Sequence, residues 1–229
     1  MMNRKNRIIA IGVLLLISLP AITKAQQVEL PNYVKVLGLK NNVKCIGVFT
    51  EDFSICCDYC TYEFGSSGNL ISYSEAEMIE GAYSRTVYFG SDGLPTHLET
   101  EFIDYWTEPD ADGNPPVTNN RYNIRKEQNG PVVKLFIEDA NGGERQVNVA
   151  RDDKGRIIEV DNVSKGEAFR YRYPDNTDVP YHYDGTLAFP QVDMVEGYRI
   201  EFPSQQNIPD NPTNFTYGIW EFDVSYHDN

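Results

Sequence analysis

The sequence predicts an all-β protein, an antiparallel meander of consecutive hairpin repeats that forms an extended, twisted sheet. Apolar and polar residues alternate in segments such as "YRIEF" (198–202) and "FRYRY" (169–173), which is the pattern of half-buried strands. Turn-forming sequences such as "NGGE" and "DDKG" separate these segments. The pattern is also compatible with a sheet curled into a barrel or cup, which is the alternative architecture.

The first element along the chain is predicted to be a secretory signal peptide, residues 1–25. A basic segment is followed by an apolar run (8–19) that is too short to span a bilayer comfortably, and small residues precede a cleavage site before Gln26. An uncleaved membrane anchor is the alternative interpretation. Residues 26–229 are predicted to form a single all-β repeat domain, exported to the periplasm or the cell exterior, with no further membrane span.

The charge of the predicted mature chain argues against two classes of partner. The full sequence has 20 basic and 34 acidic residues, and removing the four basic residues of the signal peptide leaves 16 against 34, a formal charge of −18. Such a surface repels nucleic-acid phosphates and anionic lipid headgroups. We therefore expect no nucleic-acid partner and no membrane docking through a basic patch.

A short phrase then recurs along the chain. "YEFGSSGNLISY" (62–73) and "VYFGSDGLPTHL" (87–98) share a turn that ends in Gly68 and Gly93, which are 25 residues apart. Gly130 and Gly155 are again 25 apart, and the longer middle interval accommodates a polar loop, residues 107–120. Each unit is predicted to be a strand, a polar turn and a strand, with glycine accepting positive φ. Because one hairpin cannot bury its apolar side alone, the units must extend one sheet or stack.

These phrases resemble the YD repeats of Rhs-type and related exported bacterial proteins, whose unit is roughly Tyr-x-Tyr-Asp-x-x-Gly-Arg-Leu. "YEFGSSGNL" (62–70) has Gly65 in place of the aspartate, "DDKGRIIEV" (152–160) lacks the leading aromatic pair, and "YHYDGTL" (181–187) has a shortened turn. The likeness is to small secreted proteins with a few such units. It implies consecutive antiparallel hairpins and no catalytic residues.

The final segment is predicted to be one long, bent strand. Apolar residues from Phe215 to Tyr226 change phase by one residue beside Gly218, as at a β-bulge. We expect this strand to pair with residues 198–202 across the intervening Pro/Asn-rich loop.

The cysteines are predicted to form disulfides, because the chain carries an export signal. They are Cys45, Cys56, Cys57 and Cys60. A hairpin of residues 43–49 and 53–58 would place Cys45 opposite Cys56 or Cys57, leaving Cys60 to pair with the other. A four-thiolate zinc site and a CxxC redox pair are the alternatives, although the spacing fits neither well.

The loop "EPDADGN" (108–114) partly resembles a calcium-binding loop. Glu108, Asp110 and Asp112 alternate and are followed by a glycine, but Pro115 and Asn119 stand where such a loop needs other residues. The three acidic residues are therefore a weak calcium candidate, and a solvated acidic turn is the alternative. No other metal or cofactor is predicted.

No motif in the sequence indicates catalysis. The three histidines, His97, His182 and His227, stand outside any known catalytic signature. The sequence therefore favours a non-catalytic scaffold or binding protein that presents a surface to a protein, a glycan or another copy of itself. A small-molecule carrier and a hydrolase with an unrecognised acidic site are the alternatives. A closed lumen would favour the carrier, an open curved sheet the scaffold, and a deep cleft with close carboxylates the enzyme.

Overall fold

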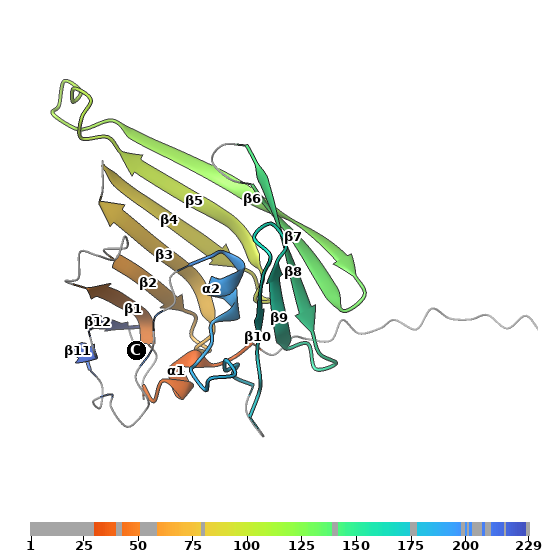
Figure 1. Ribbon diagram of the computed structural model, residues 1–229. Coiled ribbons are helices and arrows are strands. Elements are labelled where there is room, and N and C mark those ends of the chain that lie inside the picture. The colour runs from red at the N-terminus through yellow and green to blue at the C-terminus, as the bar shows by residue number, and fades with distance from the viewer. Residues whose placement is uncertain are drawn as a thin grey trace, which may run out of the picture.

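Twelve antiparallel strands form one sheet in the computed structural model of the chain (Figure 1). The structure describes residues 30–39, 43–50, 59–78, 81–138, 142–174, 178–197, 200, 202, 208, 212–217 and 219–227. The strands are β1 (Val43–Thr50), β2 (Tyr59–Phe64), β3 (Leu70–Met78), β4 (Ala82–Phe89), β5 (Pro95–Ile103), β6 (Val117–Asn129), β7 (Val132–Glu138), β8 (Glu144–Arg151), β9 (Ile157–Asn162), β10 (Glu167–Arg170), β11 (Asn214–Tyr217) and β12 (Trp220–Tyr226). The two helices are α1 (Tyr33–Val36) and α2 (Pro190–Met194).

The strands follow one another as a meander, which confirms the predicted fold class. From β2 to β10 each strand pairs with the next in sequence, and β12 and β11 extend the sheet beyond β1. The terminal strands β10 and β11 do not pair with each other, so the sheet is open and the barrel alternative is wrong. Neither helix of the described chain has the length and apolar composition needed to cross a membrane.

The sheet changes neighbours along β6. Residues 117–123 of β6 pair with β5, whereas Ile124–Asn129 pair with β7. The first half of β6 therefore has a ladder on one side only, and residues 117–121 are all exposed. Figure 1 shows the two parts of the sheet, β1–β5 and β7–β9, facing different directions on either side of this strand.

Five turns share one hydrogen-bond pattern. They cover residues 65–69, 90–94, 110–114, 152–156 and 182–186. In each turn the N–H of the first residue donates to the carbonyl of the fifth, and the N–H of the fourth donates to the carbonyl of the first, at 2.8–3.0 Å. The fourth residue is always glycine, with φ between 71° and 97°. A hairpin loop that requires a left-handed residue accounts for this choice.

The four glycines singled out in the sequence all lie in turns at one end of the meander. Gly68, Gly93 and Gly155 belong to the shared turn, whereas Gly130 (φ 61°) lies in a tighter turn between the paired residues Asn129 and Val132. The 25-residue spacing is the length of two strands with their two turns. Sequence reasoning missed Gly113 and Gly185, although "DADG" (110–113) carries the signal. The turn in "YHYDGTL" is not shortened, because it begins at residue 182.

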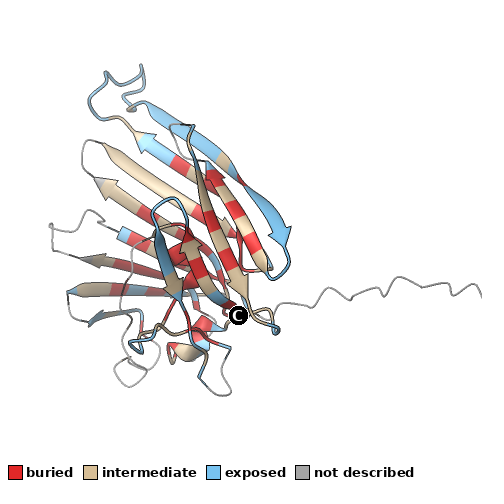
Figure 2. Cartoon of the chain, turned by 45° about the vertical axis from the view of Figure 1, so that its right-hand side comes forward, coloured by how far each residue is buried: buried red, intermediate tan, exposed pale blue. Residues whose placement is uncertain are grey.

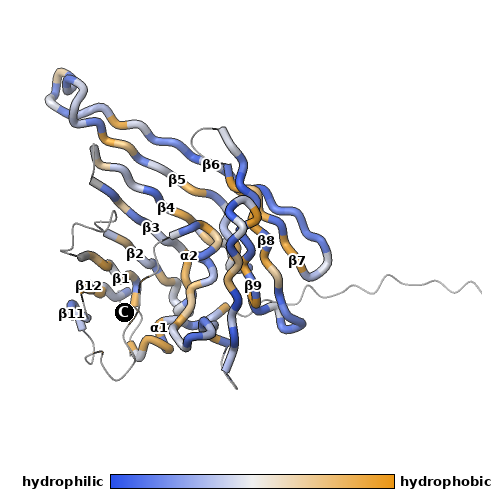
Figure 3. Tube along the Cα trace, in the orientation of Figure 1, coloured by the Kyte–Doolittle hydropathy of each residue, from blue (hydrophilic) through white to orange (hydrophobic). Residues whose placement is uncertain are grey.

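One face of the sheet, here called the inner face, carries the core. Burial alternates along the strands, most clearly in β2 and β7, and hydrophobic residues follow the same alternation (Figures 2 and 3). The C-terminal segment lies against the inner face, where Phe189 stacks on Tyr33 of α1 at 4.5 Å between ring centroids. Phe202 contacts Tyr62 of β2 and Phe222 of β12. These aromatic contacts bury the inner face at the β12–β3 side.

The last strand departs from the prediction. Tyr217 pairs with Trp220, so the change of phase is a two-residue hairpin turn between β11 and β12 rather than a bulge. β12 lies between β1 and β11 in the sheet, so both its edges are occupied; of the predicted partner segment, only residues 200 and 202 are among those described. A two-residue turn shifts the apolar phase as a bulge does, and the sequence alone did not separate the two.

The cysteines also depart from the prediction. Cys45 and Cys60 carry thiols and form no disulfide. The partner of β1 begins at Tyr59 rather than at Phe53, so Cys45 pairs with Glu63 and Cys60 with Val48. Glu63, the partner of Cys45, is three positions from Cys60 in β2, and residues three apart in a strand project to opposite faces. The two thiols therefore lie on opposite sides of the sheet. The other two cysteines, Cys56 and Cys57, and the predicted signal peptide lie outside the described residues.

Candidate functional site: the protruding β5–β6 hairpin

The hairpin of β5 and β6 extends beyond the neighbouring strands, and its tip is the loop of residues 104–116 (Figure 1). Large apolar side chains are exposed at this tip. Trp106 is 81% exposed and Tyr105 56%, and Val117 at the start of β6 is 51% exposed. Exposed apolar groups that gather at one place are typical of an interaction site, unlike single residues scattered over a surface.

Asp104 fixes the backbone that carries the two rings. Its carboxylate accepts hydrogen bonds from the N–H of Trp106 at 2.8 Å and from the hydroxyl of Thr107 at 2.6 Å. The N–H of Asp104 donates to the carbonyl of Pro116 at 3.0 Å and thereby closes the loop. The Thr107 hydroxyl, and then the Trp106 N–H, hold the pKa of Asp104 below its ordinary value. The rings are therefore presented by a backbone that is already organised before binding.

The acidic residues of the tip do not converge on one point. Asp110 accepts hydrogen bonds from the N–H groups of Asp112 and Asn114, both at 2.9 Å, so one of its oxygens closes the shared turn. No group of three or more His, Cys, Asp or Glu side chains in the described part of the chain is arranged to hold a metal ion. The structure brings Glu108, Asp110 and Asp112 into one exposed loop but not around a common point.

A groove of about 430 Å³ lies beside the hairpin on the sheet face opposite the core, here called the outer face. Two rows of polar side chains cross β4, β5 and β6 there. One row is Ser84, Glu101 and Asn119, and the other is Thr86, Glu99 and Arg121. The rows alternate with the buried positions Val87 and Leu98, which face the core. The groove therefore consists of hydroxyl, amide, carboxylate and guanidinium groups.

Glu99 organises one of these rows. Its carboxylate accepts hydrogen bonds from Arg121 at 3.2 Å and from the Tyr88 hydroxyl at 3.3 Å. His97 lies 3.7 Å from the same carboxylate and stacks on Tyr88 with 4.5 Å between ring centroids. Burial, followed by the charge of Arg121, lowers the pKa of His97, so its imidazole is neutral at neutral pH.

The other row has its hydrogen-bonding groups available. Within the described chain, no hydrogen bond joins the side chains of Ser84, Glu101 or Asn119 to another residue. They supply a hydroxyl, a carboxylate and a carboxamide, that is, both donors and acceptors. A ligand with many hydroxyl groups matches this combination, because each hydroxyl needs both kinds of partner.

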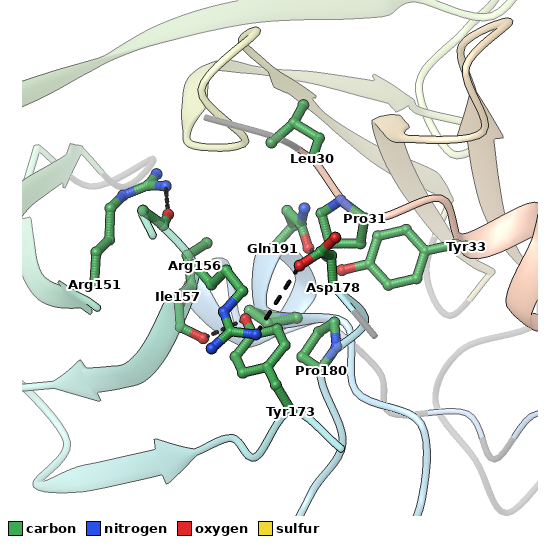
Figure 4. Close-up of a pocket in the computed structure, with 12 residues that line it drawn as sticks. Leu30, Pro31, Tyr33, Arg151, Arg156, Ile157, Tyr173, Asp178, Pro180 and Gln191 are labelled. Atoms are coloured by element: carbon green, nitrogen blue, oxygen red, sulfur yellow. Dashed lines mark hydrogen bonds and ion pairs between the residues drawn. The ribbon is translucent and has the colours of Figure 1, made fainter. Parts of the chain in front are cut away.

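A second hollow, between α1, α2 and β9, is filled by the protein itself (Figure 4). Its free volume is about 10 Å³, enough for one water molecule. The Arg156 guanidinium lies 4.3 Å from the ring centroid of Tyr173, whose hydroxyl donates to the carbonyl of Ile157 at 2.6 Å. Asp178 lies 4.0 Å from Arg156. This hollow joins the C-terminal segment to the sheet and has no room for a ligand.

The groove residues were not singled out by the sequence. Their signal is the run of polar residues at every second position in "SRTVYF" and "THLETEF", which also describes an ordinary solvated face. Only the register of β4, β5 and β6 shows that the two rows lie side by side next to the aromatic tip. No known protein family, curated protein or solved structure matches the chain.

Proposed function

We propose that the chain is an exported, non-catalytic binding protein that recognises a glycan through the β5–β6 hairpin. The observation that supports this most strongly is the exposed indole of Trp106, whose backbone is held by Asp104, beside a groove in which one row of polar side chains has no hydrogen-bond partner among the described residues. Aromatic rings stack on the apolar faces of sugar rings, and the polar row of the groove offers partners to hydroxyl groups. The resemblance to YD repeats is in keeping with a structural scaffold that carries such a surface.

The charge of the hairpin supports an uncharged ligand. The tip loop, residues 104–116, contains four acidic residues (Asp104, Glu108, Asp110 and Asp112) and no basic residue, so a phosphate or an anionic lipid is repelled. The open sheet supports a presenting surface rather than an enclosing carrier. A protein partner would bury the same rings, and it is the alternative outcome of the test.

The proposal is tested by measuring the binding of the purified protein to a glycan array, with Trp106→Ala and Tyr183→Ala as matched variants. Tyr183 is also strongly exposed, at 72%, but lies in the turn of residues 182–186, away from the hairpin. We expect Trp106→Ala to weaken glycan binding by at least tenfold, by loss of an aromatic anchor worth about 1.4 kcal/mol or more. Tyr183→Ala should bind as the wild type does.

Two results would overturn the proposal. One is that the wild-type protein binds no glycan on the array, and the other is that both variants bind as well as the wild type. If a protein partner is instead captured and Trp106→Ala abolishes that capture, the hairpin is the docking site but its ligand class is wrong.

A further inference from the structure

A cleft of about 340 Å³ lies on the inner face of the same strands, where the C-terminal segment leaves the sheet uncovered. It is enclosed by β4, β5 and β6 on one side and by β7, β8 and the residues that follow α2 on the other. Its volume falls in the range that small-molecule sites occupy, about 300–1,000 Å³. The outer-face groove and this cleft are on opposite faces of the sheet, so the inference drawn here does not depend on the proposed glycan site.

The walls of the cleft are partly apolar. Leu98 of β5 and Ile137 of β7 are both buried, and the rings of Tyr83 and Tyr122 complete this part of the lining. Neither tyrosine hydroxyl, within the residues described, has a hydrogen-bond partner. The cleft thus offers a flat apolar surface with polar groups at its edge.

Basic side chains supply more hydrogen-bond donors than the protein uses. Arg85 forms an ion pair with Glu75, but its buried Nε has no hydrogen-bond partner. Lys165 is bonded at 2.8 Å to one oxygen of Glu196, which leaves two of its three donors for other partners. The Arg85 Nε is the buried donor of the two, and a buried donor without an acceptor costs about 1–3 kcal/mol, so a ligand that brings an acceptor to it relieves a real deficit.

Glu196 is not available to bind a cation. One of its oxygens accepts from Arg145 at 2.9 Å and from Asn162, and the other accepts from Lys165. These donors hold the pKa of Glu196 below its ordinary value, against the effect of its burial. The carboxylate is therefore engaged by three donors, and it fixes Arg145 and Lys165 at the edge of the cleft.

The backbone of Glu196 supports a positioning role. Its φ is 58°, and it is the only non-glycine residue in the described ranges with positive φ. The position follows the C-terminus of α2, where glycine is the usual choice because a side chain is strained there. Strain of this kind persists where the surroundings hold the residue in place, and here three donors do so.

We propose that the inner-face cleft binds a compact organic anion with an apolar, aromatic body. Arg85 and Lys165 contact the anionic group, Glu196 positions Lys165, and the rings of Tyr83 and Tyr122 pack on the body of the ligand. An anion suits the unused donors of Arg85 and Lys165, although the lining also contains the exposed carboxylate of Glu138. An apolar body suits Leu98 and its neighbours.

The test uses 8-anilinonaphthalene-1-sulfonate, whose fluorescence reports binding, and N-phenyl-1-naphthylamine, which has the same rings without the anionic group. Both are titrated into the wild type, Lys165→Gln and Tyr122→Phe. We expect Lys165→Gln to weaken binding of the sulfonate by about tenfold, as expected for one charged hydrogen bond, and to leave the neutral amine unchanged. Tyr122→Phe keeps the ring and all charges but removes a hydroxyl donor at the edge of the cleft, and should therefore weaken the sulfonate a few-fold.

Two further variants locate the probe. Arg170→Gln removes an exposed basic residue that pairs with Glu159 on β9, outside the cleft, and should leave binding unchanged. Trp106→Ala removes the exposed ring of the hairpin tip and should also have no effect. Unfolding midpoints are measured for all variants, so that a folding defect is recognised. If either Lys165→Gln or Tyr122→Phe folds poorly, the other of these two variants decides whether the probe binds in the cleft.

The proposal is wrong if the sulfonate does not bind the wild-type protein. It is equally wrong if the sulfonate and the neutral amine bind alike in the wild type and Lys165→Gln, because the cleft then acts only as an apolar surface. Loss of the sulfonate in Trp106→Ala rather than in the cleft variants would place the probe at the hairpin tip and would also refute the proposal.

Discussion

The turn at Gly68 and the turn at Gly113 have the same hydrogen bonds but opposite surroundings. At the packed end of the sheet, a Cβ added to Gly68 would lie 2.2 Å from the Oδ1 of Asn32, and the N–H of Tyr33 donates to the carbonyl of Gly68 at 2.9 Å. At the protruding end, a Cβ on Gly113 would meet nothing within 4 Å.

This difference shows that the turn itself does not decide what a hairpin does. The shared turn needs a left-handed residue wherever it occurs, and glycine satisfies that need at both ends. Contacts with the segment before α1 make the Gly68 turn part of the core. The Gly113 turn has no such contacts, so the same local structure carries exposed rings instead.

The largest effect is expected from Gly68→Ala. The substitution adds left-handed strain and also displaces Asn32, whose side chain caps α1 by accepting from the N–H of Lys35 at 2.9 Å. Together these should reduce the free energy of unfolding by about 2–4 kcal/mol. Urea unfolding followed by circular dichroism measures this loss.

A smaller effect is expected from Gly113→Ala, because only the left-handed strain applies. We expect a loss of about 1 kcal/mol. Gly130→Ala is the matched control at the packed end, since Gly130 also has positive φ and nothing within 4 Å of an added Cβ. If all three variants lost the same free energy, the contacts of Gly68 would contribute nothing and the contrast between the two ends would fail.

The smallest effect concerns His97, which lies on β5 between the two ends. Because burial lowers its pKa in the folded chain, the unfolded chain binds a proton first as the pH falls. The free energy of unfolding should therefore decrease as the pH falls below about 6.5, until the folded imidazole is also protonated.

His97→Gln should remove this contribution and flatten the profile between pH 7 and pH 5. Urea titrations at several pH values measure it. Identical profiles for the variant and the wild type would mean that His97 is as exposed to solvent as the tip loop. The solvated, ligand-binding part of the hairpin would then extend along β5 as far as His97.

The sequence predicted the meander because period-two alternation and glycine turns are local properties. "FGSSG" and "FGSDG" each determine a turn within five residues, and successive hairpins have few ways to pair other than with their neighbours. The same local character explains the missed element at the C-terminus. A two-residue turn and a bulge both shift the apolar phase near Gly218, and only the pairing of β11 with β12, in which Tyr217 lies opposite Trp220, distinguishes them.

The sites were harder to predict, because they depend on register and on contacts between distant segments. Glu101 and Asn119 become neighbours only through the pairing of β5 with β6. Glu196 meets Arg145 and Lys165 only because the C-terminal segment returns to the inner face. The predicted disulfides failed for the same reason, since the position of Cys60 depends on where β2 begins.

The most direct measurement replaces the tip loop, residues 104–116, with an Asn-Gly turn. Ile103 and Val117 are paired in the register of β5 and β6, so a two-residue turn can close the shortened hairpin without moving either strand. We expect the free energy of unfolding to change by less than about 1 kcal/mol. We also expect the shortened protein to bind none of the glycans that the wild-type protein binds. Retained glycan binding, or a shortened chain that does not fold, would contradict the division between a packed end that stabilises the sheet and a protruding end that binds.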